Sequence, residues 1–245
     1  MLSSEEIEQG YWVAHGWPKP FLEPISDVEE YAGQEMLAIA YARVDDTPAI
    51  RKKRLKQWCQ VLPGLKIRML KLHASHQTLI EAAAQIKGLE ALSTGWGRLQ
   101  TIEPIAHCET LKSLAIDSCP SLKGLHSLPL LRKLIMLSID NVREAQDMSF
   151  VSSMTSLNEL HICGTLWTIQ KVNDLWPLVK LSELQVIKLY STRVLKDSLL
   201  PLQQLKKLVR FECSLYYPNE ELTALRQALP SLKYGTAIEF TTGES

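Results

Sequence analysis

Two short clusters of histidine and cysteine are the residues with the clearest potential for chemistry. They are His73-Ala74-Ser75-His76 and His161-Ile162-Cys163, and imidazole and thiolate groups are common metal ligands. Gly95-Trp96-Gly97 lacks the spacing of a phosphate-binding loop. The sequence contains neither a nucleophile elbow nor an H-E-x-x-H pattern. The chain therefore offers a candidate metal site to be weighed, and no catalytic motif.

The cysteines bear on the cellular compartment. Five are present, an odd number, and none forms a C-x-x-C pair. This set fits neither a disulfide framework nor a common zinc site, so a reducing cytoplasm is the simplest interpretation. The N-terminus, residues 1–6, carries acid where a secretory signal carries base. No segment approaches the roughly 18 apolar residues of a membrane helix. We expect a cytoplasmic protein without a membrane partner.

The charge balance bears on the partner. Lys plus Arg number 27 and Asp plus Glu number 27, so the formal net charge is zero. Such a chain does not concentrate nucleic acid or anionic lipid at its surface. The basic run Arg51-Lys52-Lys53-Arg54 could be a nucleic-acid or lipid patch, but apolar residues are interleaved at helical spacing. We interpret it as the solvated face of a helix and expect no nucleic-acid partner.

An internal repeat of the form L-x-x-L-x-L supplies the elements that must position these residues. Eight copies begin at residues 67, 89, 111, 134, 157, 184, 208 and 232, so the spacings are 22, 22, 23, 23, 27, 24 and 24 residues. The last copy, Leu232/Gly235/Ala237, is degenerate. Units of this length and pattern are typical of a leucine-rich repeat. Each unit is expected to contribute one strand, with its leucines in a shared core.

The second half of each unit carries an apolar residue at about every third position, for example Leu122, Leu125 and Leu128. This period predicts 3₁₀ or extended turns in place of long helices. Convex α-helices are expected only over residues 78–88 and near residues 222–229. The predicted fold is an α/β solenoid, a right-handed leucine-rich-repeat horseshoe with parallel strands on its concave face. Residues 241–245 are expected to be loose.

Residues 1–64 do not carry the repeat. A capping box at Ser26-Asp27-Val28-Glu29 predicts a helix to about Arg43, and Thr47-Pro48 begins a second one that ends near Leu62. We expect residues 1–64 to form a helical N-terminal cap, because the first coil would otherwise expose apolar surface. Residues 65–245 would form the leucine-rich-repeat domain of about eight repeats. In an alternative interpretation, the stretch from Trp12 to Pro20 binds a partner of its own.

The repeat register argues against the metal site. It places His73 on the solvent side of the first strand and His161 and Cys163 on that of the fifth, about 19 Å away if neighbouring strands are about 4.8 Å apart. Cys213 occupies an inward leucine position and Cys119 a turn position, so both are interpreted as small buried hydrophobic residues. We expect no metal and no cofactor.

The positions that flank the strand leucines line the concave face. They are mixed in charge, and small residues lie in the middle repeats, which suits a folded protein partner better than a polyanion. Trp96, Tyr190 and Arg210 belong to residue types enriched at interface hot spots. A merely solvated sheet face is the alternative. The candidate partner-binding residues are Lys71, His73, Trp96, Asp117, Asp140, Glu159, His161, Lys188, Tyr190, Arg210 and Glu212.

From residue 58 onward the sequence resembles bacterial cytosolic leucine-rich-repeat proteins with repeats near 22 residues. The resemblance covers about three quarters of the chain. Its departures are a weak asparagine ladder, a long fifth unit and an irregular last one. The segments that carry it are Trp58-Cys59-Gln60-Val61-Leu62-Pro63-Gly64-Leu65, Ser118-Cys119-Pro120-Ser121-Leu122-Lys123 and Leu229-Pro230-Ser231-Leu232-Lys233-Tyr234-Gly235.

The resemblance implies a leucine-rich-repeat fold and a non-enzymatic role as adaptor, inhibitor or recognition module, although a shared fold is a weak guide to any one role. We therefore expect a protein-binding module that acts through its concave face. The alternatives are an antitoxin-like inhibitor of a bacterial effector and a structural or assembly component. An enzyme is the least expected, because it would need a deep pocket with convergent titratable groups.

Overall fold

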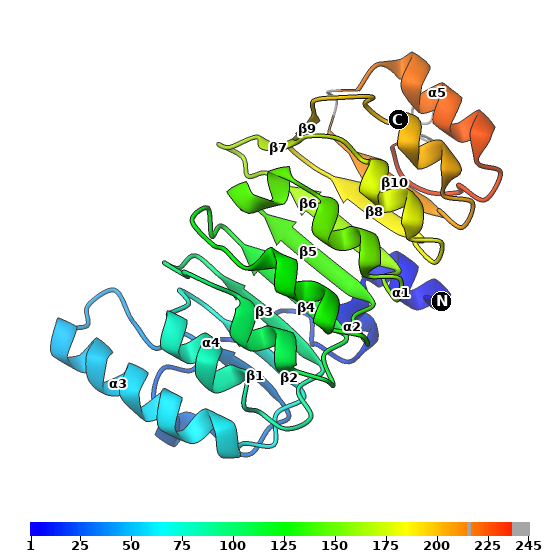
Figure 1. The fold of residues 1–245 in the computed structure, drawn as a ribbon. Coiled ribbons are helices and arrows are strands. Elements are labelled where there is room, and N and C mark those ends of the chain that lie inside the picture. The colour runs from blue at the N-terminus through cyan, green and yellow to red at the C-terminus, as the bar shows by residue number, and fades with distance from the viewer. Residues whose placement is uncertain (215–216, 237–245) are drawn as a thin grey trace.

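A computed structural model describes residues 1–214 and 217–236. The chain winds into a solenoid in which each coil contributes one strand to a parallel sheet (Figure 1). Its eight strands follow the order β1-β2-β3-β4-β5-β6-β8-β10. They are β1 (Met36–Ile39), β2 (Met69–Leu72), β3 (Ala91–Gly95), β4 (Ser113–Asp117), β5 (Met136–Asp140), β6 (Glu159–Cys163), β8 (Val186–Leu189) and β10 (Arg210–Cys213).

The strand register aligns the motif leucines from coil to coil. Leu137 on β5 pairs with Leu114 on one side and Leu160 on the other, and all three are fully buried. Side chains alternate between the two faces of a strand, so this register sends every motif leucine into the same core. The parallel strands predicted from the copies that begin at residues 67 to 208 are therefore confirmed, as is the α/β solenoid.

Short 3₁₀ helices cover the core on the side away from the sheet, as the three-residue period predicts. They are η3 (Glu103–His107), η4 (Leu125–Leu130), η5 (Arg143–Gln146), η6 (Ser149–Ser153), η7 (Trp176–Lys180) and η8 (Leu200–Gln204). The first and seventh repeats carry α-helices instead, α4 (Gln77–Ala83) and α5 (Asn219–Ala228). The two predicted convex α-helices are therefore confirmed, with α4 ending earlier than expected.

The N-terminal region differs from the prediction in several elements. The helix predicted to begin at Thr47-Pro48 is present as α3 (Pro48–Val61), followed by η2 (Leu62–Gly64). The helix predicted from Ser26 to Arg43 is wrong. A capping box forms between Asp27 and Glu30, but it opens only η1 (Val28–Glu30). Gly33 then adopts a positive φ of 89°, which leaves the helical region, and β1 follows and pairs with β2.

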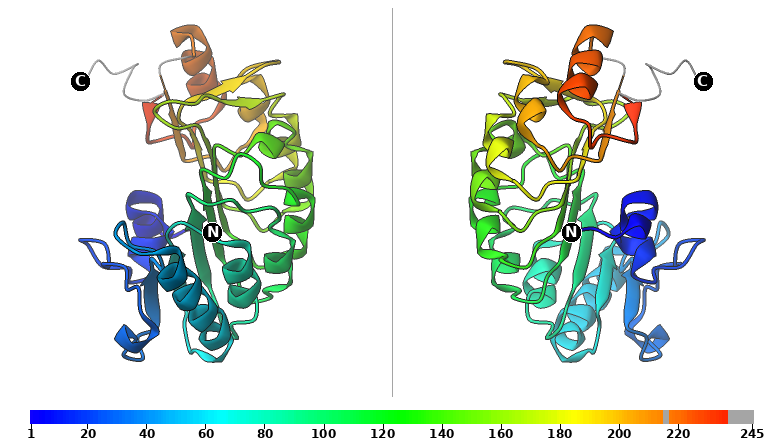
Figure 2. Two further views of the ribbon diagram at one scale, coloured as in Figure 1. Left: turned by 90° about the vertical axis from the view of Figure 1, so that its left-hand side faces the viewer. Right: turned by 90° about the vertical axis from the view of Figure 1, so that its right-hand side faces the viewer.

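The first residues of the chain run back across the sheet. They form two short helices, α1 (Ser4–Gln9) and α2 (Tyr11–Ala14). In the two side views this segment lies on the face of the sheet opposite the 3₁₀ helices (Figure 2). We call that sheet face the concave face, and residues 1–22 the covering segment.

The long fifth unit contains an insertion after β6. Its residues continue into β7 (Gln170–Val172), which pairs in parallel with β9 (Thr192–Val194) of the next coil. The pair forms a second, two-stranded sheet at the edge where the main strands end (Figure 1).

The eighth repeat is described only in part. An isolated bridge joins Arg210 and Tyr234 and continues the parallel ladder beyond β10. Ala237 of the degenerate motif and residues 241–245, predicted to be loose, lie outside the described residues. Within the described ranges, none of the helices is both long and apolar enough to cross a membrane.

Candidate functional site

Each strand has three positions that point toward the concave face or flank it, so the side chains at equivalent positions form three rows across the sheet. The covering segment buries the first row, which is formed by the residues at the start of the strands. Tyr11 and Trp17 are almost fully buried there and pack in one cluster with Met69, Ala91 and Met136. This row is therefore part of a second hydrophobic core and not an open surface.

Polar contacts hold the covering segment at several points. The backbone N–H of Leu2 donates to Oε1 of Gln185 at 2.6 Å, next to β8. Farther along, Nη2 of Arg68 donates to the backbone oxygen of His15 at 3.0 Å. The ammonium group of Lys71 lies 5.0 Å from the ring centroid of Phe21, a cation–π distance. The segment is thus tied to both ends of the sheet.

Glu159 and His161, two of the predicted contact residues, lie beneath or beside the covering segment. Glu159 is 2% exposed, because it belongs to the buried first row. Its Oε1 lies 2.7 Å from Nε2 of the half-buried His161. Glu159 is therefore unavailable to a partner while the covering segment is in place, and its contact is with His161. His73, at the end of β2, is also half-buried, and burial together with the charge of Lys71 lowers the pKa of its ring.

The third row, at the end of the strands, brings two carboxylates together. Asp117 and Asp140 are direct partners in the register of β4 and β5. The indole Nε1 of the largely exposed Trp96 donates to Oδ2 of Asp117 at 2.7 Å. Burial, followed by the charge of Asp117, raises the pKa of the Asp140 carboxyl to about 7. Cys163 on β6 is the register partner of Asp140 and is buried. This burial raises the pKa of the Cys163 thiol to about 12.

The raised pKa of Asp140 predicts a pH-dependent stability. The folded protein holds this proton up to about pH 7, whereas the unfolded chain releases it near pH 4. Stability should therefore fall as pH rises between these values, because the folded state binds more protons there. Asp140→Asn is expected to match the wild-type melting temperature at pH 4 and to exceed it at pH 8. Calorimetry across this range checks the prediction, and identical pH profiles for both proteins would contradict it.

A charged network forms around Glu212 in the last repeats. The hydroxyl of Tyr190 donates to its Oε2, and Nη1 of Arg210 donates to its Oε1 at 2.9 Å. The ammonium group of Lys188 lies 3.8 Å from Oε2. Burial alone would raise the pKa of Glu212, but the bond from Tyr190 and the two cations hold it below its ordinary value. The guanidinium of Arg210 also lies 5.4 Å from the ring centroid of Tyr234.

The structure thus joins the predicted residues into separate groups. Lys188, Tyr190, Arg210 and Glu212 form one network, and Trp96, Asp117 and Asp140 form another. Sequence reasoning missed the covering residues Tyr11 and Trp17. A signal was present, because the first-row positions include Met69, Ala91, Met136 and Val186, which are apolar where a solvated sheet face would carry polar side chains.

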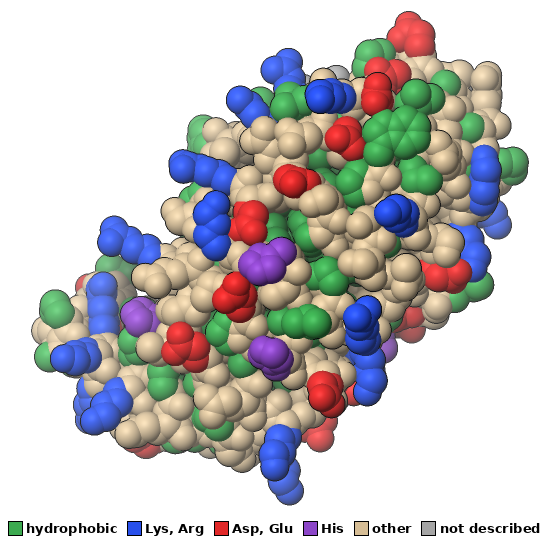
Figure 3. Space-filling model, in the orientation of Figure 1, with side chains coloured by type: hydrophobic (Ala, Val, Ile, Leu, Met, Phe, Trp, Pro, Cys, Tyr) green, Lys and Arg blue, Asp and Glu red, His purple; other side chains and the backbone are tan. Residues whose placement is uncertain are grey.

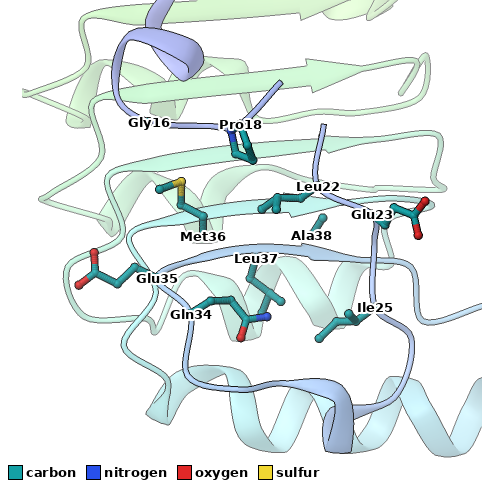
Figure 4. A pocket seen from close by; sticks show the side chains of 10 residues that line it. All are labelled: Gly16, Pro18, Leu22, Glu23, Ile25, Gln34, Glu35, Met36, Leu37 and Ala38. Carbon is teal, nitrogen blue, oxygen red and sulfur yellow. The ribbon is translucent and has the colours of Figure 1, made fainter. Parts of the chain in front are cut away.

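The hollows of the surface bear on the enzyme alternative. A hollow of about 390 Å³ lies between the covering segment and β1. Its carboxylates, Glu23 and Glu35, point away from each other at its rim (Figure 4), so they do not converge on a ligand. A second hollow, of about 330 Å³, is lined by Ser138, Glu159 and His161.

Ser138, His161 and Glu159 are the residue types of a catalytic triad, but their geometry does not form one here. The hydroxyl of Ser138 bonds to Asp140 at 3.4 Å. The strands on both sides pair with neighbours along this stretch, so their N–H groups are not free to bind an oxyanion. Among the described residues, no three His, Cys, Asp or Glu side chains are grouped to hold a metal.

The parallel strands, the 3₁₀ helices and the buried motif leucines together make up the leucine-rich-repeat fold. No protein-family model matches the sequence, and no curated protein matches it either. The likeness is instead to solved structures.

Three solved structures illustrate the likeness. Internalin C2 of Listeria monocytogenes is 21% identical over 70% of this chain and 71% of its own, with a TM-score of 0.51. A second Listeria monocytogenes internalin is 22% identical over 75% of this chain and 48% of its own, also at 0.51. A leucine-rich-repeat protein of Leptospira interrogans is 16% identical over 87% and 52%, at 0.56. The chain spans about half of the latter two, and at these identities the likeness concerns the fold.

Proposed function

We propose that this protein is a non-enzymatic protein-binding module of the bacterial cytoplasm that acts through the part of its concave face that the covering segment leaves exposed. The observation that carries the proposal is the network of Lys188, Tyr190, Arg210 and Glu212 beside the covering segment. It presents charges of both signs and an aromatic ring that is 42% exposed, on strands that the core holds rigid. This combination suits a folded protein partner.

The network is preorganised for binding. Tyr190 and Arg210 both bond to Glu212, so their side chains are ordered before a partner arrives. A partner then has fewer rotamers to freeze, which favours affinity. Trp96, bonded to Asp117, would extend the same surface toward the first repeats.

The cytoplasmic placement rests on the cysteines. All five lie in the described part of the chain as free thiols, and four of them are buried. Burial raises the pKa of Cys108 and of Cys213 to about 11, so neither is a reactive thiolate.

Within the fold, we assign residues 1–64 to capping and residues 65–245 to the repeat domain.

The proposal predicts the effect of Tyr190→Ala. Removing the ring should weaken binding by about 2 kcal/mol or more if Tyr190 is a hot spot. Tyr190→Phe is the matched control, because it keeps the ring and removes the hydroxyl that donates to Glu212. Affinity capture from the native cell, followed by mass spectrometry, would supply the partner, and calorimetric titration of both variants would measure the change. Unaltered affinity of Tyr190→Ala would remove this network from the binding surface.

A further inference from the structure

The insertion in the fifth unit forms a tight apolar tip. The backbone N–H of Thr165 donates to the oxygen of Thr168 at 2.8 Å, and the Thr165 hydroxyl accepts from the N–H groups of Trp167 and Thr168. These bonds fix the loop while Leu166 and Trp167 are each 93% exposed. We call residues 164–169 the insertion tip. Nothing in the core requires large apolar side chains at this position.

Three cations lie next to the insertion tip, one on each of three successive coils. They are Arg143 on η5, Lys171 on β7 and Arg193 on β9, and we call them the basic ladder. All three are exposed. Lys and Arg side chains are visible along the edge of the molecule where β7 and β9 lie (Figure 3). In the described part of the chain, no carboxylate lies within 4.0 Å of these three side chains.

The basic ladder is unfavourable for folding. Lys171 and Arg193 are direct partners in the register of β7 and β9, and their side chains extend from the same face of this small sheet. Like charges directly opposite each other destabilise a strand pair. The like-charge pair therefore lowers the stability of the fold and has no structural role that would account for it. This is the pattern expected of a binding surface.

A hollow of about 290 Å³ joins the tip to the ladder. Arg143 and Lys171 line it on the charged side, and Pro120 and Ile169 provide apolar surface. The side chains of Asn141 and Gln146 add polar groups to its wall. A carboxylate flanked by an apolar side chain would satisfy both kinds of lining.

We propose that this edge is a second docking surface, and that its occupant is an acidic, partly apolar segment of another protein. Carboxylates of the partner bind the basic ladder, and its apolar side chains pack against Leu166, Trp167 and Ile169. Trp and Arg are the residue types enriched where proteins meet. This surface lies beyond the ends of the strands and is distinct from the Glu212 network.

The structure favours a protein over other anionic partners. Nucleic acid is bound chiefly through many phosphate contacts, whereas this ladder has three cations on a chain of zero net charge. A membrane would be met by a broad amphipathic face, but the insertion tip presents only two fully projecting apolar residues. A small mixed surface with a hollow matches a protein segment.

The test uses the full-length chain and a defined probe, a short fluorescent peptide in which Glu alternates with Leu. The peptide is expected to bind the wild type, and salt should weaken that binding. Lys171→Glu/Arg193→Glu is expected to lose about tenfold or more in affinity. Arg132→Glu/Lys180→Glu is the matched control. It makes the same charge change at exposed sites on the segments that lead into β5 and β8 and should bind as the wild type does.

Further measurements complete the test. Lys171→Glu alone should raise the melting temperature, because it turns a like-charge pair with Arg193 into an opposite-charge pair, and should still weaken peptide binding. Trp167→Ala should weaken it too, whereas Tyr190→Ala should leave it unchanged. Absence of peptide binding, or equal loss in the control pair, would overturn the proposal. Tighter binding to phosphatidylserine vesicles or to a single-stranded oligonucleotide, lost in the same variants, would also overturn it.

Discussion

Replacing Leu160 with Asp is expected to lower the free energy of unfolding by about 4 kcal/mol or more. Leu160 is fully buried in the centre of β6. Its register partners are Leu137 and Ile187 on the two neighbouring strands, so the aspartate would enter an apolar layer with no group to pair with it. Because each coil relies on its neighbours, the loss should spread beyond the fifth repeat.

Leu166→Asp provides a matched control for this substitution. It makes the same chemical change six residues later, at a side chain that is 93% exposed in the insertion tip, and should shift stability by no more than about 0.5 kcal/mol. Denaturant unfolding followed by circular dichroism would compare the two variants with the wild type. Equal midpoints for Leu160→Asp and Leu166→Asp would show that the strand register is wrong.

The repeats could be predicted from the sequence because their signal is both local and periodic. A motif leucine such as Leu114 or Leu137 recurs at nearly constant spacing, and that spacing alone determines which side chains share the core. The strand β1 was missed for a local reason. Its first motif position is occupied by Gln34, and the acid-rich capping box just before it favours a helix. Pairing with β2, which buries Leu37 and Ile39, outweighs that local preference.

The surface was harder to predict than the core. The outward direction of Lys188, Tyr190 and Glu212 follows from the motif phase, and the structure places these side chains in one network. The cover over the first row could not be derived in the same way. Tyr11 and Trp17 reach Met136 across more than a hundred residues of sequence, and no periodic pattern encodes a contact of that kind.

Deleting residues 1–64 is expected to make the remaining repeats aggregate or lose cooperative unfolding. The deletion removes β1, so that the unpaired edge of β2 is exposed to other chains. It also removes Trp58 and Leu62, which are fully buried in the main core, and leaves the apolar end of the solenoid open to water. Size-exclusion chromatography and thermal unfolding of residues 65–245 would measure both effects.

A shorter deletion, of residues 1–22, separates the two parts of this region. It keeps β1 paired with β2 and keeps α3 on the core, so the shortened chain should fold. It uncovers Met69, Ala91 and Met136, and the protein should therefore be less stable than the wild type and bind more of a hydrophobic dye. The larger deletion should be far more damaging, because a solenoid tolerates an exposed sheet face better than an exposed end. If residues 65–245 alone stay monomeric and as stable as the whole chain, the first 64 residues are an independent module and not a cap.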